Sequence, residues 1–75
     1  MKLALVEWVD SCSDCGWTYL ENPLHSSNII TVGLVLLDDT TEIVLAMSRS
    51  NTGRVTERMA IPKCCVKRIR YLRIK

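Results

Sequence analysis

The stretch from residue 29 to residue 75 decides the expected fold. It reads IITVGLVLLDDTTEIVLAMSRSNTGRVTERMAIPKCCVKRIRYLRIK. Val, Ile and an alternation of apolar and polar residues favour β-strands, and short polar turns favour antiparallel neighbours. The pattern predicts four consecutive strands over residues 29–37, 42–47, 54–61 and 66–74.

The first of these stretches is apolar on both faces, so we expect a central and buried strand. Gly33 in its middle is the expected place for a sharp bend or bulge. In residues 42–47 the alternation points Ile43, Leu45 and Met47 inward. Pro62 has no N–H for a strand ladder, so the third strand is expected to end there.

The N-terminal part adds one more strand and a long connection. Residues 2–9 alternate well enough to place Ala4, Val6 and Trp8 on one face. Residues 10–28 are rich in Ser, Asp, Asn, Gly and Pro, and a connection of more than about 12–15 residues is often functional. Within it, residues 17–20 (WTYL) could form a short strand or place an aromatic ring over one end of the domain. Five strands of this size are expected to close on themselves, which hides their edges. The predicted fold is therefore a single all-β domain over residues 1–75, a small, strongly bent, five-stranded antiparallel barrel.

Length and composition narrow the class of protein. A chain of 75 residues without Phe supports only one small core. Domains with so small a core have marginal stability, and many are stabilised by self-association. No apolar run reaches the roughly 18–20 residues of a membrane helix. The N-terminal MKLALVEWVD is too short an apolar run for a signal peptide and contains Glu7. We therefore expect a cytoplasmic protein without a membrane partner.

Charge is divided unevenly along the chain. Residues 1–48 hold seven acidic residues against Lys2 alone, whereas residues 49–75 hold nine basic residues against Glu57 alone. This asymmetry indicates an anionic partner or head-to-tail self-association, and two solvated faces of unlike sign are the plain alternative.

The basic C-terminal strand supplies the candidate site. Lys and Arg interleaved with apolar residues are typical of phosphate contacts, and Tyr71 or Trp17 could stack on a base. The alternative is an edge strand that charges protect from aggregation. We take as candidate nucleic-acid contacts Lys63, Lys67, Arg68 and Arg70.

Other reactive residues give weaker signals. Residues 12–15 form a CxxC, but Cys64 and Cys65 are adjacent, and neighbours on a strand point to opposite faces. This favours packed or solvated cysteines over a zinc site, with a reducing cytosol as the default. His25 is the only histidine, and no partner is identified by spacing. We expect no catalytic residue, no metal and no cofactor, so the protein is predicted not to be an enzyme.

Apolar surface is in excess. A small barrel has one interior, so the outward side of residues 29–37 must be covered by the long connection, by the N-terminal strand or by another chain. Scattered exposed apolar side chains are the ordinary alternative. Strand pairing between subunits would bury such edges and close a ring.

Residues 32–45 (VGLVLLDDTTEIVL) resemble the first signature of Sm-like proteins, including the bacterial RNA-chaperone type. Residues 61–69 resemble the second signature by position, with Lys63 standing for the basic residue of the bacterial type. Glu42 stands near the family's RNA-facing Asn, and the family's N-terminal helix is absent. The residues that match the first signature in kind are Gly33, Val35, Asp38, Ile43 and Leu45.

The chain as a whole is similar to small uncharacterised proteins encoded by tailed bacteriophages, some of which resemble Sm-type barrels that assemble into rings. The segments that carry this likeness are VEWVD (6–10), Gly16-Trp17, residues 32–33 and residues 61–63. The resemblance implies a phage-encoded Sm/SH3-like barrel in the host cytoplasm that forms a homo-oligomeric ring, and it carries no RNA site over, because Glu42 places a carboxylate where an anion would approach. Together with the basic C-terminal strand, the Sm-like pattern predicts a non-enzymatic protein that binds RNA. The alternative is a protein-interaction module that acts on a host or phage protein without binding nucleic acid.

Overall fold

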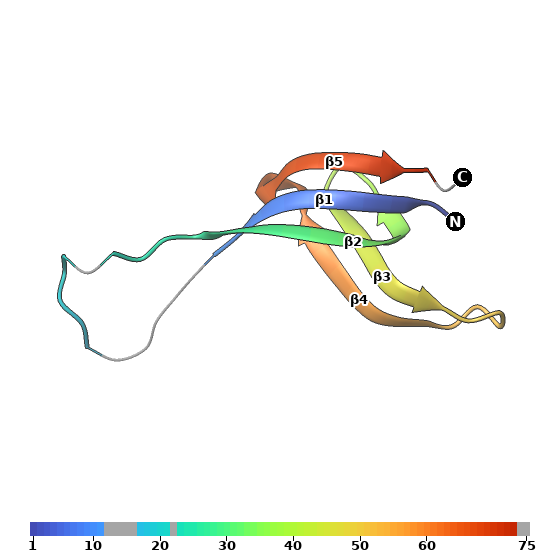
Figure 1. Cartoon of the computed structure of the whole chain (residues 1–75), viewed down its shortest axis with the longest axis horizontal. Coiled ribbons are helices and arrows are strands. Elements are labelled where there is room, and N and C mark those ends of the chain that lie inside the picture. The colour runs from blue at the N-terminus through green and yellow to red at the C-terminus, as the bar shows by residue number, and fades with distance from the viewer. Residues whose placement is uncertain (12–16, 22, 74–75) are drawn as a thin grey trace.

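The protein is an all-β structure with five strands in one antiparallel sheet (Figure 1). The computed structural model describes residues 1–11, 17–21 and 23–73. No helix in these ranges is long and apolar enough to cross a membrane. The strands, joined by one short 3-10 turn, η1, are β1 (Leu3–Asp10), β2 (Ser27–Asp38), β3 (Glu42–Arg49), β4 (Val55–Pro62) and β5 (Val66–Leu72), with η1 at Lys63–Cys65 between the last two. The all-β prediction and its five strands are confirmed.

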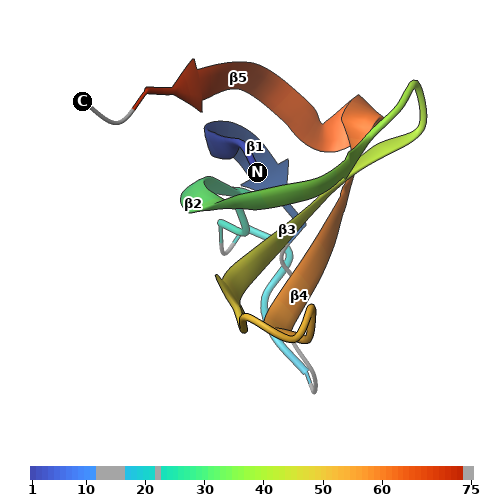
Figure 2. The ribbon, with the colours of Figure 1, turned by 90° about the vertical axis from the view of Figure 1, so that its right-hand side faces the viewer.

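The strand order is β4-β3-β2-β1-β5, so β2 is central as predicted. The expectation that β4 and β5 are neighbours is wrong, because η1 redirects the chain and β5 pairs with β1 instead. The Lys63 backbone N–H anchors this turn to the Thr41 carbonyl at 2.8 Å. The sheet curls strongly (Figure 2), but in the described part of the chain no ladder joins β4 to β5. A single chain therefore has two open edges, where closure had been expected.

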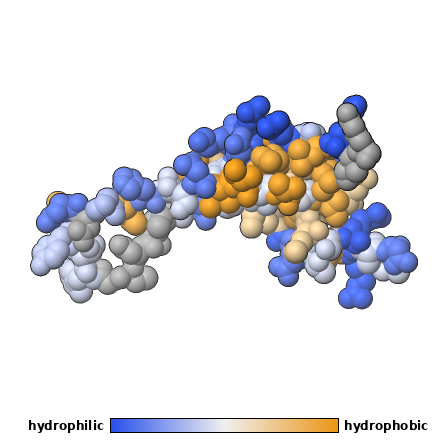
Figure 3. Space-filling view, viewed as in Figure 1, coloured by the Kyte–Doolittle hydropathy of each residue, from blue (hydrophilic) through white to orange (hydrophobic). Residues whose placement is uncertain are grey.

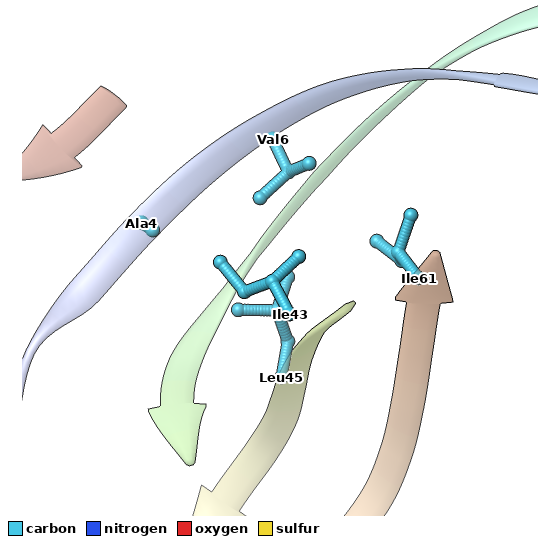
Figure 4. Packing of buried hydrophobic residues seen from close by; sticks show 5 residues of the cluster. All are labelled: Ala4, Val6, Ile43, Leu45 and Ile61. Carbon is cyan, nitrogen blue, oxygen red and sulfur yellow. The ribbon is translucent and has the colours of Figure 1, made fainter. Parts of the chain in front are cut away.

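The core lies inside the curl. Its five central side chains converge from β1, β3 and β4 (Figure 4), and they are Ala4, Val6, Ile43, Leu45 and Ile61. The inward orientation predicted for Ile43 and Leu45 is confirmed. The one predicted for Met47 is wrong, because its side chain is 74% exposed. The β3–β4 hairpin continues past the strands that would cover it (Figure 1), so its far half has no facing layer.

Gly33 allows β3 to approach β2 closely, and it is not the site of a bulge. Register runs through Gly33 without interruption, and the shift in β2 lies between Val35 and Leu37. A Cβ at Gly33 would stand 3.0 Å from the Ala46 carbonyl oxygen and 3.1 Å from the Leu45 Cβ. The predicted bulge therefore exists on β2 but at Leu36.

Register also shows which side chains share the outer face of the sheet. Directly paired residues project to the same side, so the β1 residues Leu3 and Leu5 share a face with their partners on β2 and β5. The apolar members of this face, called the outer patch below, are Leu3, Leu5, Ile30, Val32, Leu34 and Leu72. Ile30 is 66% and Val32 is 54% exposed, so the prediction that this strand is buried on both faces is wrong for its outer face. Figure 3 shows the apolar surface over β1 and β2.

The connection between β1 and β2 extends beyond the end of the sheet (Figure 1). Residues 17–21 and 23–26 of this connection, called the arm below, contain no strand, and Trp17 and Leu20 are fully exposed. The predicted short strand or aromatic cover over the domain is therefore wrong. The radius of gyration is 15.7 Å, against about 11 Å for a compact domain of this length.

Candidate nucleic-acid interface

Three of the four predicted nucleic-acid contacts lie together along β5. Lys67, Arg68 and Arg70 are all exposed, and a register shift at this point makes Lys67 an extra residue between the pairs Trp8–Val66 and Glu7–Arg68. The Lys67 ammonium reaches across β1 to the Asn28 side-chain oxygen at 3.4 Å. Asn28 alternates with Ile30, so this contact lies on the outer face. The basic row therefore borders the outer patch, where Figure 3 shows a hydrophilic strip.

Lys63 lies elsewhere. It belongs to η1, and its ammonium contacts the Asp38 carboxylate at 2.5 Å and the Asp39 carbonyl at 2.6 Å. The Tyr71 hydroxyl donates to the other oxygen of the same Asp38 carboxylate. A phosphate would have to compete with this carboxylate for Lys63. Through these contacts Lys63 links η1 to the β2–β3 turn, and it is separate from the basic row on β5.

The contacts of Asp38 account for its electrostatics. Hydrogen bonds from Lys63 and, second, from Tyr71 lower the pKa of the Asp38 carboxyl below its usual value of 3.8. The same bond raises the pKa of the Tyr71 hydroxyl, because ionisation would place a phenolate beside a carboxylate. The Lys2 ammonium also lies 5.3 Å from the centre of the Tyr71 ring. Tyr71 is therefore engaged at its ring and its hydroxyl, which makes it a poor stacking platform.

Asp39 has a structural role in the β2–β3 turn. Its carboxylate accepts the backbone N–H of Thr41 at 2.8 Å and that of Glu42 at 2.9 Å. These two bonds lower the pKa of Asp39. The β2–β3 turn is thus held by its own acidic side chain, as Asx turns are.

Folding brings the two unlike halves of the sequence together. Asp38 of the acidic half pairs with Lys63 of the basic half, and Glu7 lies directly opposite Arg68. Acidic and basic residues from the two halves of the sequence therefore already meet within one chain. The uneven charge distribution is for this reason a weaker indication of head-to-tail association.

Of the four cysteines, the structure describes Cys64 and Cys65. Cys64 and Cys65 lie in η1 and not on a strand, as free thiols whose sulfurs are 4.0 Å apart. Hydrogen bonding to Cys64 is the main cause that raises the pKa of Cys65. Cys12 and Cys15 lie outside the described residues. Within the described ranges, no group of three or more His, Cys, Asp or Glu residues is placed to hold a metal ion. His25 is exposed in the arm.

A second basic site was not predicted. The tip of the β3–β4 hairpin encloses a hollow of about 380 Å³, lined by Ser48, Arg49, Ser50, Thr52, Arg54, Val55 and Thr56. The Ser50 N–H donates to the Arg54 carbonyl at 2.8 Å and the Gly53 N–H donates to the Ser50 carbonyl at 3.1 Å, and Gly53 adopts a φ of 89°. Arg49 and Arg54 flank residues 50–53 (SNTG) in the sequence, and this placement was the available signal.

Comparisons of the chain with protein-family models, with curated proteins and with solved structures found no match.

Proposed function

We propose that the protein is a non-enzymatic Sm/SH3-like module that assembles into a homo-oligomeric ring and binds RNA through the outer face of β5. The observation that carries the RNA proposal is the row of three exposed cations, Lys67, Arg68 and Arg70, on one strand. Such rows fit a phosphate backbone without reading its sequence. Lys63 contributes to the β2–β3 and β4–β5 turns, and we place it outside the direct contacts.

The open edges support the ring. β4 and β5 each present a row of backbone groups without a partner strand in one chain, which is a template for pairing with another copy. Pairing of β4 in one copy with β5 in the next is head-to-tail, and such contacts close into rings. Side chains stand perpendicular to the sheet, so the basic row would stay accessible after this pairing.

Salt-dependent binding to single-stranded RNA oligonucleotides tests the RNA proposal. Replacing Lys67, Arg68 and Arg70 together by Gln should reduce the slope of log K against log salt by about 2, since each phosphate contact on single strands contributes roughly 0.7. The matched control replaces three arginines of the β3–β4 hairpin, Arg49, Arg54 and Arg58, by Gln. Equal losses in both variants, or no binding of the wild type at low salt, would reject the β5 site.

Hydrogen exchange tests the ring. If β4 and β5 pair between copies, the amides on their outer edges should exchange slowly in concentrated protein and rapidly after dilution. Light scattering on the same samples should report a closed, discrete mass. Rapid exchange of these amides at every concentration would argue against edge pairing.

A second candidate function is a protein-interaction module for a host or phage protein. The observation that favours it is the full exposure of Trp17 and Leu20 in the arm. Capture from nuclease-treated host lysate should then retain a specific protein that is lost with Trp17→Ser/Leu20→Ser and retained with the triple Gln variant of β5. A capture that needs intact nucleic acid would favour the RNA proposal instead.

A further inference from the structure

The arm carries large apolar side chains that are mostly exposed. Trp17 and Leu20 are fully exposed, Tyr19 is 74% exposed and Leu24 is 52% exposed. Two aromatic residues and two leucines within so short a segment leave a large apolar area in water, and burying that area against another apolar surface is favourable. The arm is therefore a segment that fits an apolar surface.

The outer patch is an apolar surface that stays partly exposed to solvent in the described part of the chain. Ile30, Val32 and Leu72 are exposed there, and Leu3, Leu5 and Leu34 are half-buried beside them. Figure 3 shows apolar surface gathered over β1 and β2. Contiguous patches of this kind usually mark protein–protein contacts.

The β1–β2 ladder directs the arm away from the patch of its own chain. Pairing continues to Val9–Asn28 and Asp10–Ser27, so both roots of the arm leave along the strand axis. Figure 1 shows the arm continuing in that direction, and the longest dimension of the chain is 51 Å against 24 and 23 Å across it. Docking on its own sheet would require both roots to reverse, whereas a neighbouring copy can meet the arm as it stands.

We propose that the arm of one copy docks on the outer patch of a second copy of this chain, with Trp17, Tyr19 and Leu20 against Ile30 and Val32. The charges agree with this pairing. Glu21 follows the apolar arm residues, and Arg68 and Arg70 border the receiving patch. The contact uses the faces of the strands and not their edges, so it is independent of ring closure through β4 and β5, whereas at Arg68 and Arg70 the arm would compete with RNA for the proposed basic row.

The expected area suits a specific contact. Two aromatic side chains bury about 300–500 Å². The patch loses a similar area, which gives about 800 Å² for one arm. Two arms exchanged between two copies would bury about 1,600 Å², the standard size of a stable protein–protein interface.

A mixing experiment tests the contact directly. The acceptor variant Trp17→Ser/Leu20→Ser keeps the patch but lacks the arm anchors. The donor variant Ile30→Thr/Val32→Thr keeps Trp17 but loses the patch, and Thr preserves the β-branched backbone preference of β2. After subtraction of the Trp8 emission, which a donor that also carries Trp17→Ser and the acceptor alone provide, the Trp17 fluorescence of the donor should be that of a solvated indole at all concentrations and should shift to the blue when the acceptor is added. Wild-type protein should show the same shift with rising concentration.

The matched control mixes the donor with an acceptor that also carries Met47→Ser. Met47 is an exposed apolar residue outside the patch, so this change should not affect the contact. An acceptor that also carries Met47→Ser should produce the full shift. Thermal unfolding of every variant verifies that each is folded.

Three outcomes would overturn the proposal. One is a blue-shifted Trp17 in the wild type at every concentration, which would mean that the arm folds on its own chain. Another is a donor that shifts with concentration by itself, which would place the arm on some other surface. The third is the absence of any shift in the wild type or in the mixture. Each can occur whether or not the protein binds RNA, so failure here is distinguishable from failure of the proposed function.

The charged border gives an independent readout. Glu21→Arg should weaken the arm contact up to about fivefold, the range of one exposed ion pair. Raising the salt concentration should weaken the arm contact only modestly, because its main component is apolar, whereas RNA binding should fall steeply. An arm contact that increases in affinity with Glu21→Arg would contradict the orientation proposed.

Discussion

Gly33 controls how closely β3 approaches β2. Gly33→Ala would place a Cβ 3.0 Å from the Ala46 carbonyl, which is backbone and cannot rotate away. We expect a loss of about 1–3 kcal/mol in the free energy of unfolding, as for other overpacked sites. Urea denaturation measures this. Gly53→Asn is the control, since Asn tolerates positive φ and nothing lies within 4 Å of this position. Equal stability of Gly33→Ala and the wild type would contradict the close approach.

Asp38 makes stability depend on pH in the acid range. Its pKa is lower in the folded protein than the unfolded value of 3.8. Its contribution is therefore complete above pH 3.8 and is lost as pH falls through the lower, folded pKa. Asp38→Asn should flatten this part of a melting-temperature profile, and Lys63→Gln should do so partly, because the bond to Lys63 is the largest cause of the shift.

Asp39 retains its own lowered pKa, so some acid dependence should remain in the Asp38→Asn variant. A profile identical to that of the wild type would show that the Lys63–Asp38 pair does not persist in solution.

At the scale of elements, β4 contributes to the core through one end only. Ile61 is buried opposite Ile43, whereas most of the strand is exposed. Ile61→Val should cost about 0.5–1.5 kcal/mol and Ile61→Ala about 2–5 kcal/mol. Met47→Ala on the adjoining strand should stay within about 0.5 kcal/mol. Denaturant titration compares the three, and a Met47 loss as large as that of Ile61 would place the core differently.

The strands were predictable because their signals are local. Alternation over β1 placed Ala4 and Val6 on one face, which the structure shows to be the inner one, and Pro62 marked the end of β4. The neighbour of β5 was not predictable, because a three-residue turn at Lys63–Cys65 decides it. A short link normally joins adjacent strands, and here the turn carries the chain across the curl to β1.

At the scale of the whole molecule, the arm should be separable from the fold. The β1–β2 ladder reaches Asp10–Ser27, so residues 11–26 can be replaced by Asn-Gly, which suits a two-residue hairpin. Shortening the connection about eightfold should stabilise the protein by up to about 2 kcal/mol, at roughly 0.6 kcal/mol per halving. Calorimetry measures this gain, and X-ray scattering should show a radius of gyration well below 15.7 Å.

This variant also separates the proposals. It should keep salt-dependent RNA binding through β5 and lose the contact between arm and patch. An unfolded variant would mean that the connection is part of the folding unit.

The sequence alone determined the fold class, the number of strands, the central position of β2 and the inward residues Ile43 and Leu45. These follow from periodicity and turn residues, which act over a few neighbours. It also identified Lys67, Arg68 and Arg70 as a row, since they belong to one strand.

Only the tertiary structure decided which distant groups meet. It brought Lys63 and Tyr71 to the same Asp38 carboxylate, left the edges of β4 and β5 open in the described part of the chain, and exposed both the outer side of β2 and the arm. The physical reason is that the direction of two turns, η1 and the β1–β2 connection, decides these contacts. Residues far apart in the chain carry no local signal of which way such a turn leads.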